Sequence, residues 1–525
     1  MTACITPDVT TQKTQYVTAG TVLSVARFDA DAVTDHSENR NAGTGQSGVT
    51  EFPAELLRFF TQEQGRVLLV RGDPGAGKTL FAVQALDVLR QYGGDVLYVS
   101  TRVDADTVYS NYLQETTGLT RSNVLDISQT PTDADIAPAE ALGTDRFDPE
   151  AFLEWLRAIG DVSDPLTIVF DSWELVERHL LSKAHQDEPI DSGRLVTRMA
   201  TLARSNGVRV VLITENSEQT SLDYVVDGVI ELSVEHNAGG RPERTLLFEK
   251  LRGIRIGNRT RPFTLSGETF RVFTPVDLPG PQGPIGASDL TRIDNSKSTF
   301  STGIADLDAM LDDGYSRGSV VHLELGPDLS RDAWSLLCFA TARNFLAHDM
   351  CVAVVPLPES SPGLTRHNLE PALPDTEFET RCDVFETYDH EHSKTNTETG
   401  RAAPADDAVG GFDYENYLRR LVALREESNG PLLQIISMDA TGDVFNDIMS
   451  DHATYVALHN DLSILVTKPE NGERTRSDQI ADIHLCLERK GETAFLYGKN
   501  PVTPFLGFDM SVAAGILDVS LQEMV

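Results

Sequence analysis

Lysine, paired cysteines and long apolar runs are what this sequence lacks most clearly. Nine of its 525 residues are lysine, so arginine supplies most of the positive charge. The five cysteines are scattered without paired spacing, which disfavours a disulfide framework or a cysteine-based metal site and favours buried free thiols. No stretch approaches the roughly 18 apolar residues of a membrane span. The first twenty residues also lack the basic-then-apolar pattern of a secretion signal. We therefore expect a cytoplasmic protein that does not enter a membrane.

Acidic side chains dominate the charge, with 80 Asp and Glu against 44 Lys and Arg and a net charge of −36. An acidic, lysine-poor surface stays hydrated at high salt, so we expect a halophilic source. A specialised acidic partner surface is the alternative, but the excess is spread along the chain. The charge makes direct DNA binding unfavourable unless a local basic patch overrides it. The length of the chain predicts two or more domains.

A phosphate-binding loop is the clearest motif. Its residues fit G-x-x-x-x-G-K-[ST] and are Gly72, Asp73, Pro74, Gly75, Ala76, Gly77, Lys78 and Thr79. An apolar strand at 67–70 precedes the loop, and a helical pattern at 79–89 follows it. Glycines let backbone N–H groups turn toward phosphate oxygens, and the helix adds its positive end. Lys78 can reach the β- and γ-phosphates, and Thr79 can place its hydroxyl on Mg²⁺. A glycine-rich turn that has lost its nucleotide is the alternative.

Buried strands alternate with helical segments through the first half of the chain. Strands are predicted at 95–100, 166–171 and 208–214, which implies a parallel, doubly wound sheet. Ligands bind at the carboxyl ends of such strands. Asp171 ends one of these strands, so it is expected beside the loop, where it can hold a water on Mg²⁺. A carboxylate that caps the following helix is the alternative interpretation.

Positive charge is concentrated in one segment that follows an antiparallel-looking extension at 225–232. The cations of this basic segment are Arg241, Arg244, Lys250, Arg252, Arg255, Arg259 and Arg261. They could contact phosphate, nucleic acid or an acidic partner. A solvated strand face is the alternative.

The second half of the chain repeats the strand pattern of the first. The corresponding pairs are 320–326 with 67–72, 351–355 with 96–99, 432–439 with 166–171, and 462–467 with 208–214. At the loop, Arg331, Asp332 and Ala333 stand where Gly77, Lys78 and Thr79 stand in the first half. The second copy has therefore lost the groups that would hold a nucleotide.

The predicted fold is α/β, with two tandem domains whose sheets are mostly parallel and doubly wound, the second with a degenerate nucleotide site. The expected boundaries are a mobile polar tail at 1–50, a nucleotide-binding domain at 51–274, a Pro/Gly linker at 275–297 and a second domain at 298–525. The second domain carries a polar insertion at about 386–412. His390 and His392 lie in that insertion, but nothing else in the sequence supports a metal site there.

These motifs resemble the RecA/KaiC-like ATPases. The run Ser301-Thr302-Gly303-Ile304 and the residues up to Ser319 resemble the start of a domain in that family, and 72–79, 169–172 and 249–253 resemble its other motifs. The resemblance covers about residues 50 to 510. It implies that both tandem domains are RecA-like. It also implies ATP and Mg²⁺ as ligands, with Lys78, Thr79 and Asp171 in catalytic roles.

The resemblance also implies a homo-oligomer. In KaiC-like rings a Lys-x-Arg pair reaches across the subunit boundary to the γ-phosphate of the neighbour, and Lys250 and Arg252 match that pair. Ordinary exposed strand charges are the alternative.

One departure from the family concerns hydrolysis. The family places a catalytic glutamate pair just after the second strand, whereas Ser100-Thr101-Arg102 stands there in this chain, and the nearest acids are Asp104 and Asp106. A site without a carboxylate in line accepts a proton from water poorly. We therefore expect strong nucleotide binding and slow hydrolysis, unless Glu174, Glu177 or Glu215 takes the missing role.

Within the family, the tandem layout, the acidity and the arginine-rich segment most resemble the regulators of gas-vesicle genes in haloarchaea. That resemblance implies a nucleotide-dependent repressor that opposes a leucine-zipper-like transcriptional activator. The alternative is a KaiC/RecA-like ring ATPase that acts on DNA or in signal transduction, against which the acidity and the missing glutamates count. A clock-type kinase would need an active second domain.

Overall fold

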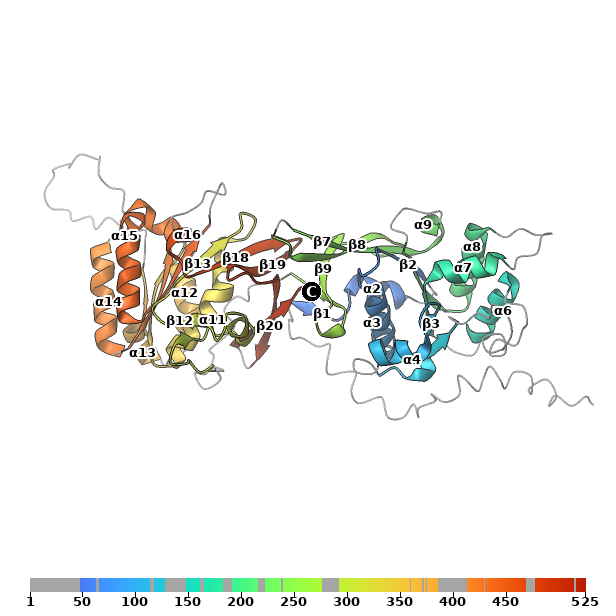
Figure 1. Ribbon diagram of the computed structural model, residues 1–525, viewed down its shortest axis with the longest axis horizontal. Coiled ribbons are helices and arrows are strands. Elements are labelled where there is room, and N and C mark those ends of the chain that lie inside the picture. Colours follow the sequence, from blue (N-terminus) through green and yellow to red (C-terminus); the bar gives the residue numbers. More distant parts are fainter. Residues whose placement is uncertain are drawn as a thin grey trace, which may run out of the picture. The chain divides into compact units, whose positions relative to one another are not determined.

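A computed structural model gives the fold (Figure 1). It describes residues 48–62, 66–113, 118–127, 148–160, 165–182, 191–215, 222–237, 239–275, 292–358, 360–370, 373, 375–385, 412, 414–428, 430–468, 477–513 and 516–525. Nearly all of the predicted tail at 1–50, most of the linker at 275–297 and most of the insertion at 386–412 lie outside these residues, as do His390 and His392.

The chain divides into two compact units. Most of the first is Thr50–Val272, and most of the second is Phe273–Met524. In Figure 1 the first unit runs from blue to green and the second from yellow to red.

The first unit is built on a mixed sheet. Its strands are β1 (Val49–Thr50), β2 (Val67–Arg71), β3 (Asp95–Ser100), β4 (Val124–Asp126), β5 (Leu166–Asp171), β6 (Arg209–Ile213), β7 (Gly228–His236), β8 (Pro242–Leu251), β9 (Thr260–Thr264) and β10 (Arg271–Phe273). The strand order is β1-β10-β9-β8-β7-β2-β6-β5-β3-β4. Pairing is parallel from β7 through β2 to β4 and antiparallel from β7 through β8 and β9 to β10.

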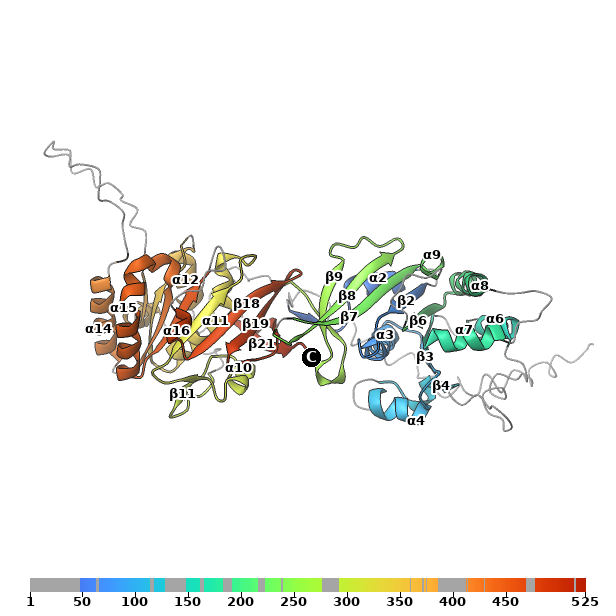
Figure 2. The ribbon, with the colours of Figure 1, turned by 45° about the horizontal axis from the view of Figure 1, so that its top comes forward.

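Helices cover both faces of this sheet, as Figure 2 shows. They are α2 (Ala54–Phe60), α3 (Lys78–Gln91), α4 (Ala105–Val108), α6 (Pro149–Gly160), α7 (Trp173–Ser182), α8 (Ser192–Ser205) and α9 (Leu222–Val225). Side chains alternate between the two faces of a strand. Leu68 and Val70 of β2 therefore pack with α2, α3 and α4, while Val67 and Leu69 pack with α6 to α9. Burial on both faces explains why β2 reads as an unbroken apolar run.

The second unit has its own mixed sheet. Its strands are β13 (Val320–Leu325), β14 (Cys351–Val355), β15 (Cys382–Val384), β16 (Leu432–Ser437), β17 (Leu462–Thr467), β18 (Ile483–Lys490), β19 (Thr493–Asn500), β20 (Leu506–Ala513) and β21 (Ile516–Glu523). The order is β15-β14-β16-β17-β13-β18-β19-β20-β21, and a separate pair is formed by β11 (Thr299–Phe300) and β12 (Tyr315–Ser316).

Helices again lie on both sides of the second sheet. They are α10 (Ala305–Met310), α11 (Ser335–Ala347), α12 (Pro362–Leu369), α13 (Asp375–Arg381), α14 (Tyr414–Ser428), α15 (Met438–His459) and α16 (Ser477–Ile480). One core contains side chains of α10 to α13, and the other contains side chains of α14 and α15.

Apart from the short edge strand β1, the two sheets share one strand order. Each central strand, β2 or β13, lies between two parallel neighbours, and each sheet ends in an antiparallel run of strands, β8 to β10 or β19 to β21. Both antiparallel junctions carry an irregularity at the same place, between Val229 and Ile230 and between His484 and Leu485. The expected α/β class is confirmed, but each sheet is mixed because its antiparallel part is longer than the sequence pattern indicated.

One hydrogen-bond pair also recurs in both units. The Asp227 carboxylate accepts from the backbone N–H of Val67 at 3.2 Å, and the Asp482 carboxylate accepts from that of Val320 at 2.9 Å. In return, the backbone N–H of each aspartate donates to the carbonyl of the same valine at 2.9 Å. Val67 and Val320 therefore occupy equivalent positions.

This equivalence shifts the sequence alignment of the loops by one residue. Gly77 precedes α3 as its N-cap, ten positions after Val67, and Ser330 precedes the 3-10 turn at Arg331–Trp334, ten positions after Val320. Arg331 and Asp332 thus stand at the positions of Lys78 and Thr79. The sequence alignment, which placed Asp332 opposite Lys78, was wrong at this loop because Gly326 was matched to Gly72.

Candidate nucleotide-binding site

The loop after β2 turns tightly at the carboxyl end of the central strand. Gly72 comes so close to β7 that an added Cβ would lie 2.2 Å from the Leu232 carbonyl oxygen. Gly77 has a φ of 96°, and a Cβ there would lie 2.8 Å from a methyl group of Leu265. Asp73, Pro74 and Gly75 are exposed at the tip, while Ala76 is buried. Gly72 is therefore required by the nearby backbone as well as by its own conformation, and Gly77 chiefly by its conformation.

Lys78 is buried and its ammonium turns back onto the loop. Its Nζ donates to the carbonyl oxygens of Gly72 at 2.6 Å and Asp73 at 2.8 Å. Burial lowers the pKa of Lys78, while the negative charges of Glu215 and Asp171 act in the opposite direction. The loop therefore holds a cation in its concavity, where the phosphate chemistry requires one.

Thr79 and Asp171 meet as the sequence predicted. The Thr79 hydroxyl donates to Asp171 Oδ2 at 2.8 Å. The same oxygen accepts from the Tyr98 hydroxyl at 2.6 Å, a contact that the sequence did not reveal. Tyr98 is buried on β3, and burial together with the Asp171 charge raises its pKa well above the usual range, so it stays a donor. A tyrosine in a strand has no special sequence signal, and only the pairing of β3 with β5 brings it to the site.

The place where the family puts glutamates holds a structural hydroxyl instead. Thr101 follows β3, and its Oγ1 donates to the Asp171 carbonyl oxygen at 3.0 Å and accepts from the Ser172 N–H at 2.7 Å. Arg102 forms an ion pair with Glu215. Asp104 caps α4 by accepting from the Thr107 N–H at 2.9 Å. Thr101 and Asp104 therefore bind backbone groups, and Arg102 binds Glu215.

The other candidate bases differ in how far they are engaged, and one buried oxygen each of Glu174 and Glu177 has no hydrogen-bond partner. Glu174 accepts from the Thr214 hydroxyl and from the Glu215 N–H, the latter at 2.7 Å. Burial raises the pKa of Glu177. Asp106 pairs with Arg121 at 2.6 Å. Thr214 and Glu215 directly follow β6, so their contacts with Glu174 put Glu174 and Glu215 at the carboxyl end of the sheet, where the loop lies.

Of the predicted pair, Arg252 lies at the other end of the sheet, whereas Lys250 lies opposite Val229, level with the middle of β2. Lys250 Nζ donates to the carbonyl oxygens of Asp223 at 2.8 Å and Val226 at 2.6 Å, and burial lowers its pKa. Arg252 pairs with the buried Asp227 at 3.0 Å, beside the first residue of β2. Because a strand rises about 3.3 Å per residue, Arg252 is roughly 13 Å or more from the start of the loop. The fold of one chain therefore separates Arg252 from its own phosphate loop, while Lys250 is engaged by backbone carbonyls on the sheet.

Another cation of the basic segment does reach the loop. Arg244 of β8 donates to the Gly75 carbonyl oxygen at 3.2 Å, and burial lowers its pKa. Other members pair within the unit, Arg259 with Glu249 at 3.6 Å and Arg261 with Glu55 at 2.8 Å. The sequence predicted that the basic segment could contact phosphate, but it did not show which cation would do so. The pairing of β7 with β8 brings Arg244 to the loop.

Comparison with known proteins identifies the family. Residues 56–249 match the family described as GvpD gas vesicle protein, P-loop domain, and residues 289–525 match the one described as GvpD basic region 2. Protein GvpD2 of Halobacterium salinarum is 45% identical over 92% of this chain and 99% of its own length. This chain belongs to the GvpD family of gas vesicle proteins. Protein GvpD1 of the same organism is 42% identical over 92% of this chain and 98% of its own.

A more distant likeness supports the resemblance to KaiC. The circadian clock oscillator protein KaiC of Rippkaea orientalis is 27% identical over 49% of this chain and 47% of its own length. The phosphate-loop domain is therefore related to KaiC. This relation supports nucleotide binding together with a metal ion. Among the residues that the structure describes, no helix is long and apolar enough to cross a membrane.

Proposed function

We propose that this GvpD-family protein is an ATP-binding regulator that acts as a nucleotide-dependent switch in the cytoplasm of a halophilic archaeon. The observation that carries the proposal is the assembly of Lys78, Thr79 and Asp171 at one loop. Arg331 and Asp332 stand at the positions of Lys78 and Thr79 in the second unit. We infer two tandem RecA-like domains, at 51–274 and 298–525, with one working and one degenerate site. The shared strand order supports this duplication.

The residues present suit a magnesium–ATP complex. The backbone N–H groups of 72–79 would face the phosphates, and Lys78 would exchange its two carbonyl acceptors for phosphate oxygens. Mg²⁺ would supply positive charge that offsets the charge of the phosphates. The Thr79 hydroxyl would bind the ion, and Asp171 would accept from a water on it, with Tyr98 keeping the carboxylate oriented. Arg244 would keep the tip of the loop in place through Gly75.

We propose that hydrolysis is slow. The position after β3 carries Thr101, whose hydroxyl is hydrogen-bonded to the backbone. Glu215 forms an ion pair with Arg102, so its carboxylate is not a free base. Glu174 is the best substitute base, because it lies beside Thr214 at the end of β6, but two donors already hold one of its oxygens. Steady-state turnover of the purified chain at high salt tests this. A rate comparable to that of a motor ATPase would contradict it.

The proposed output is repression of gas-vesicle genes through a protein partner, a leucine-zipper-like transcriptional activator. Family membership supports the gas-vesicle context, and the net charge of −36 makes direct DNA binding unfavourable. A ligand can shift the balance between two states only through different affinities for them. We therefore expect ATP to change the affinity for the partner. A reporter for gas-vesicle transcription, measured with wild type and Lys78→Met, tests this, and full repression by the variant would remove the nucleotide from the mechanism.

A second candidate function is favoured by the KaiC likeness. Arg252 of the predicted pair lies far from the loop of its own chain, so a neighbouring subunit's nucleotide in a ring is the one it could reach. A ring ATPase acting on DNA or in signal transduction would then be the activity. ATPase stimulated by single-stranded DNA would favour this function, and its absence would favour the regulator. Molar mass measured with and without ATP tests the homo-oligomer.

A further inference from the structure

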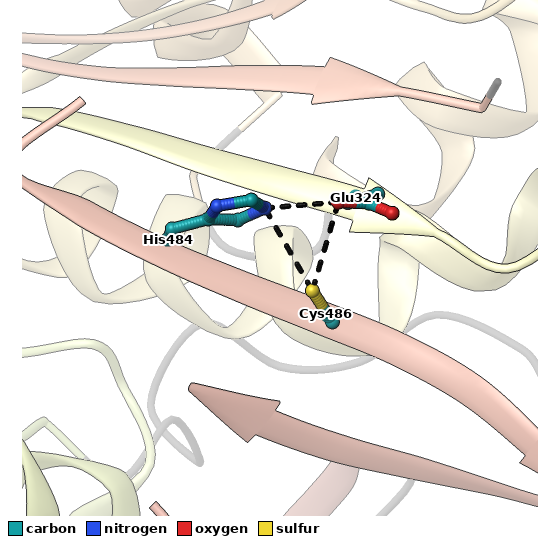
Figure 3. A group of neighbouring side chains, drawn as sticks. All are labelled: Glu324, His484 and Cys486. Carbon is teal, nitrogen blue, oxygen red and sulfur yellow. Dashed lines mark hydrogen bonds and ion pairs between the residues drawn. The ribbon is translucent and has the colours of Figure 1, made fainter. Parts of the chain in front are cut away.

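Three potential ligand atoms converge on one face of the second sheet. Glu324 lies on β13, and His484 and Cys486 lie on the adjacent β18, where Glu324 is directly opposite Cys486. Figure 3 shows the three side chains pointing toward one another across the two strands. Their ligand atoms lie within 4.8 Å of one another, and Glu324 and His484 are only partly covered while Cys486 is buried. An ion could therefore reach the group from one side.

The separations between the three ligand atoms are close to those around a metal ion. Glu324 Oε2 is 3.0 Å from His484 Nε2 and 3.8 Å from Cys486 Sγ, and Sγ is 3.7 Å from Nε2. Oxygen, nitrogen and sulfur ligands bind tetrahedral zinc at about 2.0, 2.05 and 2.3 Å, which puts them roughly 3.3–3.6 Å apart. The three observed separations lie on either side of that range. A small movement of the glutamate would complete the geometry.

We propose that Glu324, His484 and Cys486 form a binding site for a divalent transition-metal ion, with Zn²⁺ as the best fit. One imidazole nitrogen, one thiolate and one carboxylate are the ligand types that zinc prefers. Three protein ligands leave a fourth position for water. Hard cations such as Mg²⁺ and Ca²⁺ prefer oxygen ligands alone, so they would not select this set.

The ammonium of Lys499 pairs with Glu324 when no metal is bound. Its ammonium lies 2.7 Å from Glu324 Oε2, and its side chain is 43% exposed. As the zinc–sulfur bond forms, Cys486 gives its thiol proton to solvent, and the Lys499–Glu324 ion pair breaks. Because the Lys499 side chain is open to water, its ammonium can turn outward. The charges of the thiolate and the carboxylate balance those of the ion.

The equivalent ladder positions of the first unit hold no such set. Through the matched valines, Arg71 stands at the position of Glu324, Val229 at that of His484 and Glu231 at that of Cys486. Arg71 pairs with Glu231 at 3.6 Å, so a guanidinium fills that place. The proposed metal site therefore belongs to the second unit, whereas the nucleotide loop belongs to the first.

The test uses the full, tag-free chain at high salt, titrated with Zn²⁺ by calorimetry and with Co²⁺ by absorption. We expect one equivalent to bind with a thiolate-to-cobalt charge-transfer band. Cys486→Ser should remove that band, and Cys486→Ser or His484→Gln should weaken zinc binding by about a hundredfold, the upper range seen for outer-shell changes alone. Glu488→Gln, a carboxylate further along β18, should leave binding unchanged.

A second variant keeps the proposal falsifiable if the ligand changes impair folding. Lys499→Met removes the competing ammonium without touching a ligand, so zinc should bind about two- to fivefold more tightly. Weaker or unchanged zinc binding by Lys499→Met would overturn the proposal. So would a wild-type chain that binds no stoichiometric zinc, or a cobalt band that persists in Cys486→Ser.

Discussion

Replacing Lys78 with methionine tests the site most directly. Lys78 Nζ has two carbonyl acceptors, at 2.6 and 2.8 Å, and in the bound state it would give both bonds to phosphate oxygens. Hydrogen bonds to charged groups contribute about 1.5–3 kcal/mol each, but two existing bonds are exchanged, so we expect a net loss of about 2–4 kcal/mol of binding free energy. That corresponds to roughly 30- to 800-fold weaker ATP binding. Removing a buried ammonium offsets the two lost loop bonds, so the free energy of unfolding should change by less than about 1 kcal/mol.

The assay is equilibrium binding of a fluorescent ATP analogue to the full chain in high salt with Mg²⁺, with thermal unfolding as the check on folding. Arg331→Met is the matched control, because Arg331 occupies the equivalent position in the second unit. We expect binding by this control to equal that of wild type. If Arg331→Met lost the nucleotide and Lys78→Met retained it, the assignment of the working site would be refuted.

Three other predictions follow from individual contacts. Thr79→Val removes the hydroxyl that donates to Asp171. The increase in ATP affinity caused by Mg²⁺ should then be about tenfold smaller, while the affinity without Mg²⁺ is unchanged. Titrations with and without Mg²⁺ measure both affinities. Asp227→Ala leaves the Val67 N–H without its carboxylate acceptor and should lower the free energy of unfolding by about 3 kcal/mol in urea melts; a loss below about 1 kcal/mol would contradict this. Burial lowers the pKa of His452 from 6.5 to about 4, so the unfolded state takes up a proton first, and about 3 kcal/mol of stability should be lost as the pH falls from 6.5 to 4. His452→Gln should flatten that dependence, and an unchanged pH slope would show that another group causes it.

Local patterns in the sequence were sufficient for the loop and for its central strand. Spacing alone placed Gly72 to Thr79 between an apolar strand and a helix, because a phosphate cradle needs glycines and a helix end in adjacent residues. The strand that ends in Asp171 was also predicted, since burial on both faces makes it continuously apolar. The loop alignment of the two halves was off by one residue, because a glycine is a weak marker when the strand ladder is not known.

Contacts between residues far apart in the chain were decided by the tertiary structure. Tyr98 reaches Asp171, and Arg244 reaches Gly75, only because parallel and antiparallel ladders bring their strands to the same edge. The group of Glu324, His484 and Cys486 depends on the register between β13 and β18, which no local pattern encodes. The sequence by itself determined which residue types could hold a triphosphate, because that chemistry needs neighbouring residues. Strand register determined which distant side chains meet, because pairing partners are chosen by the packing of the whole sheet.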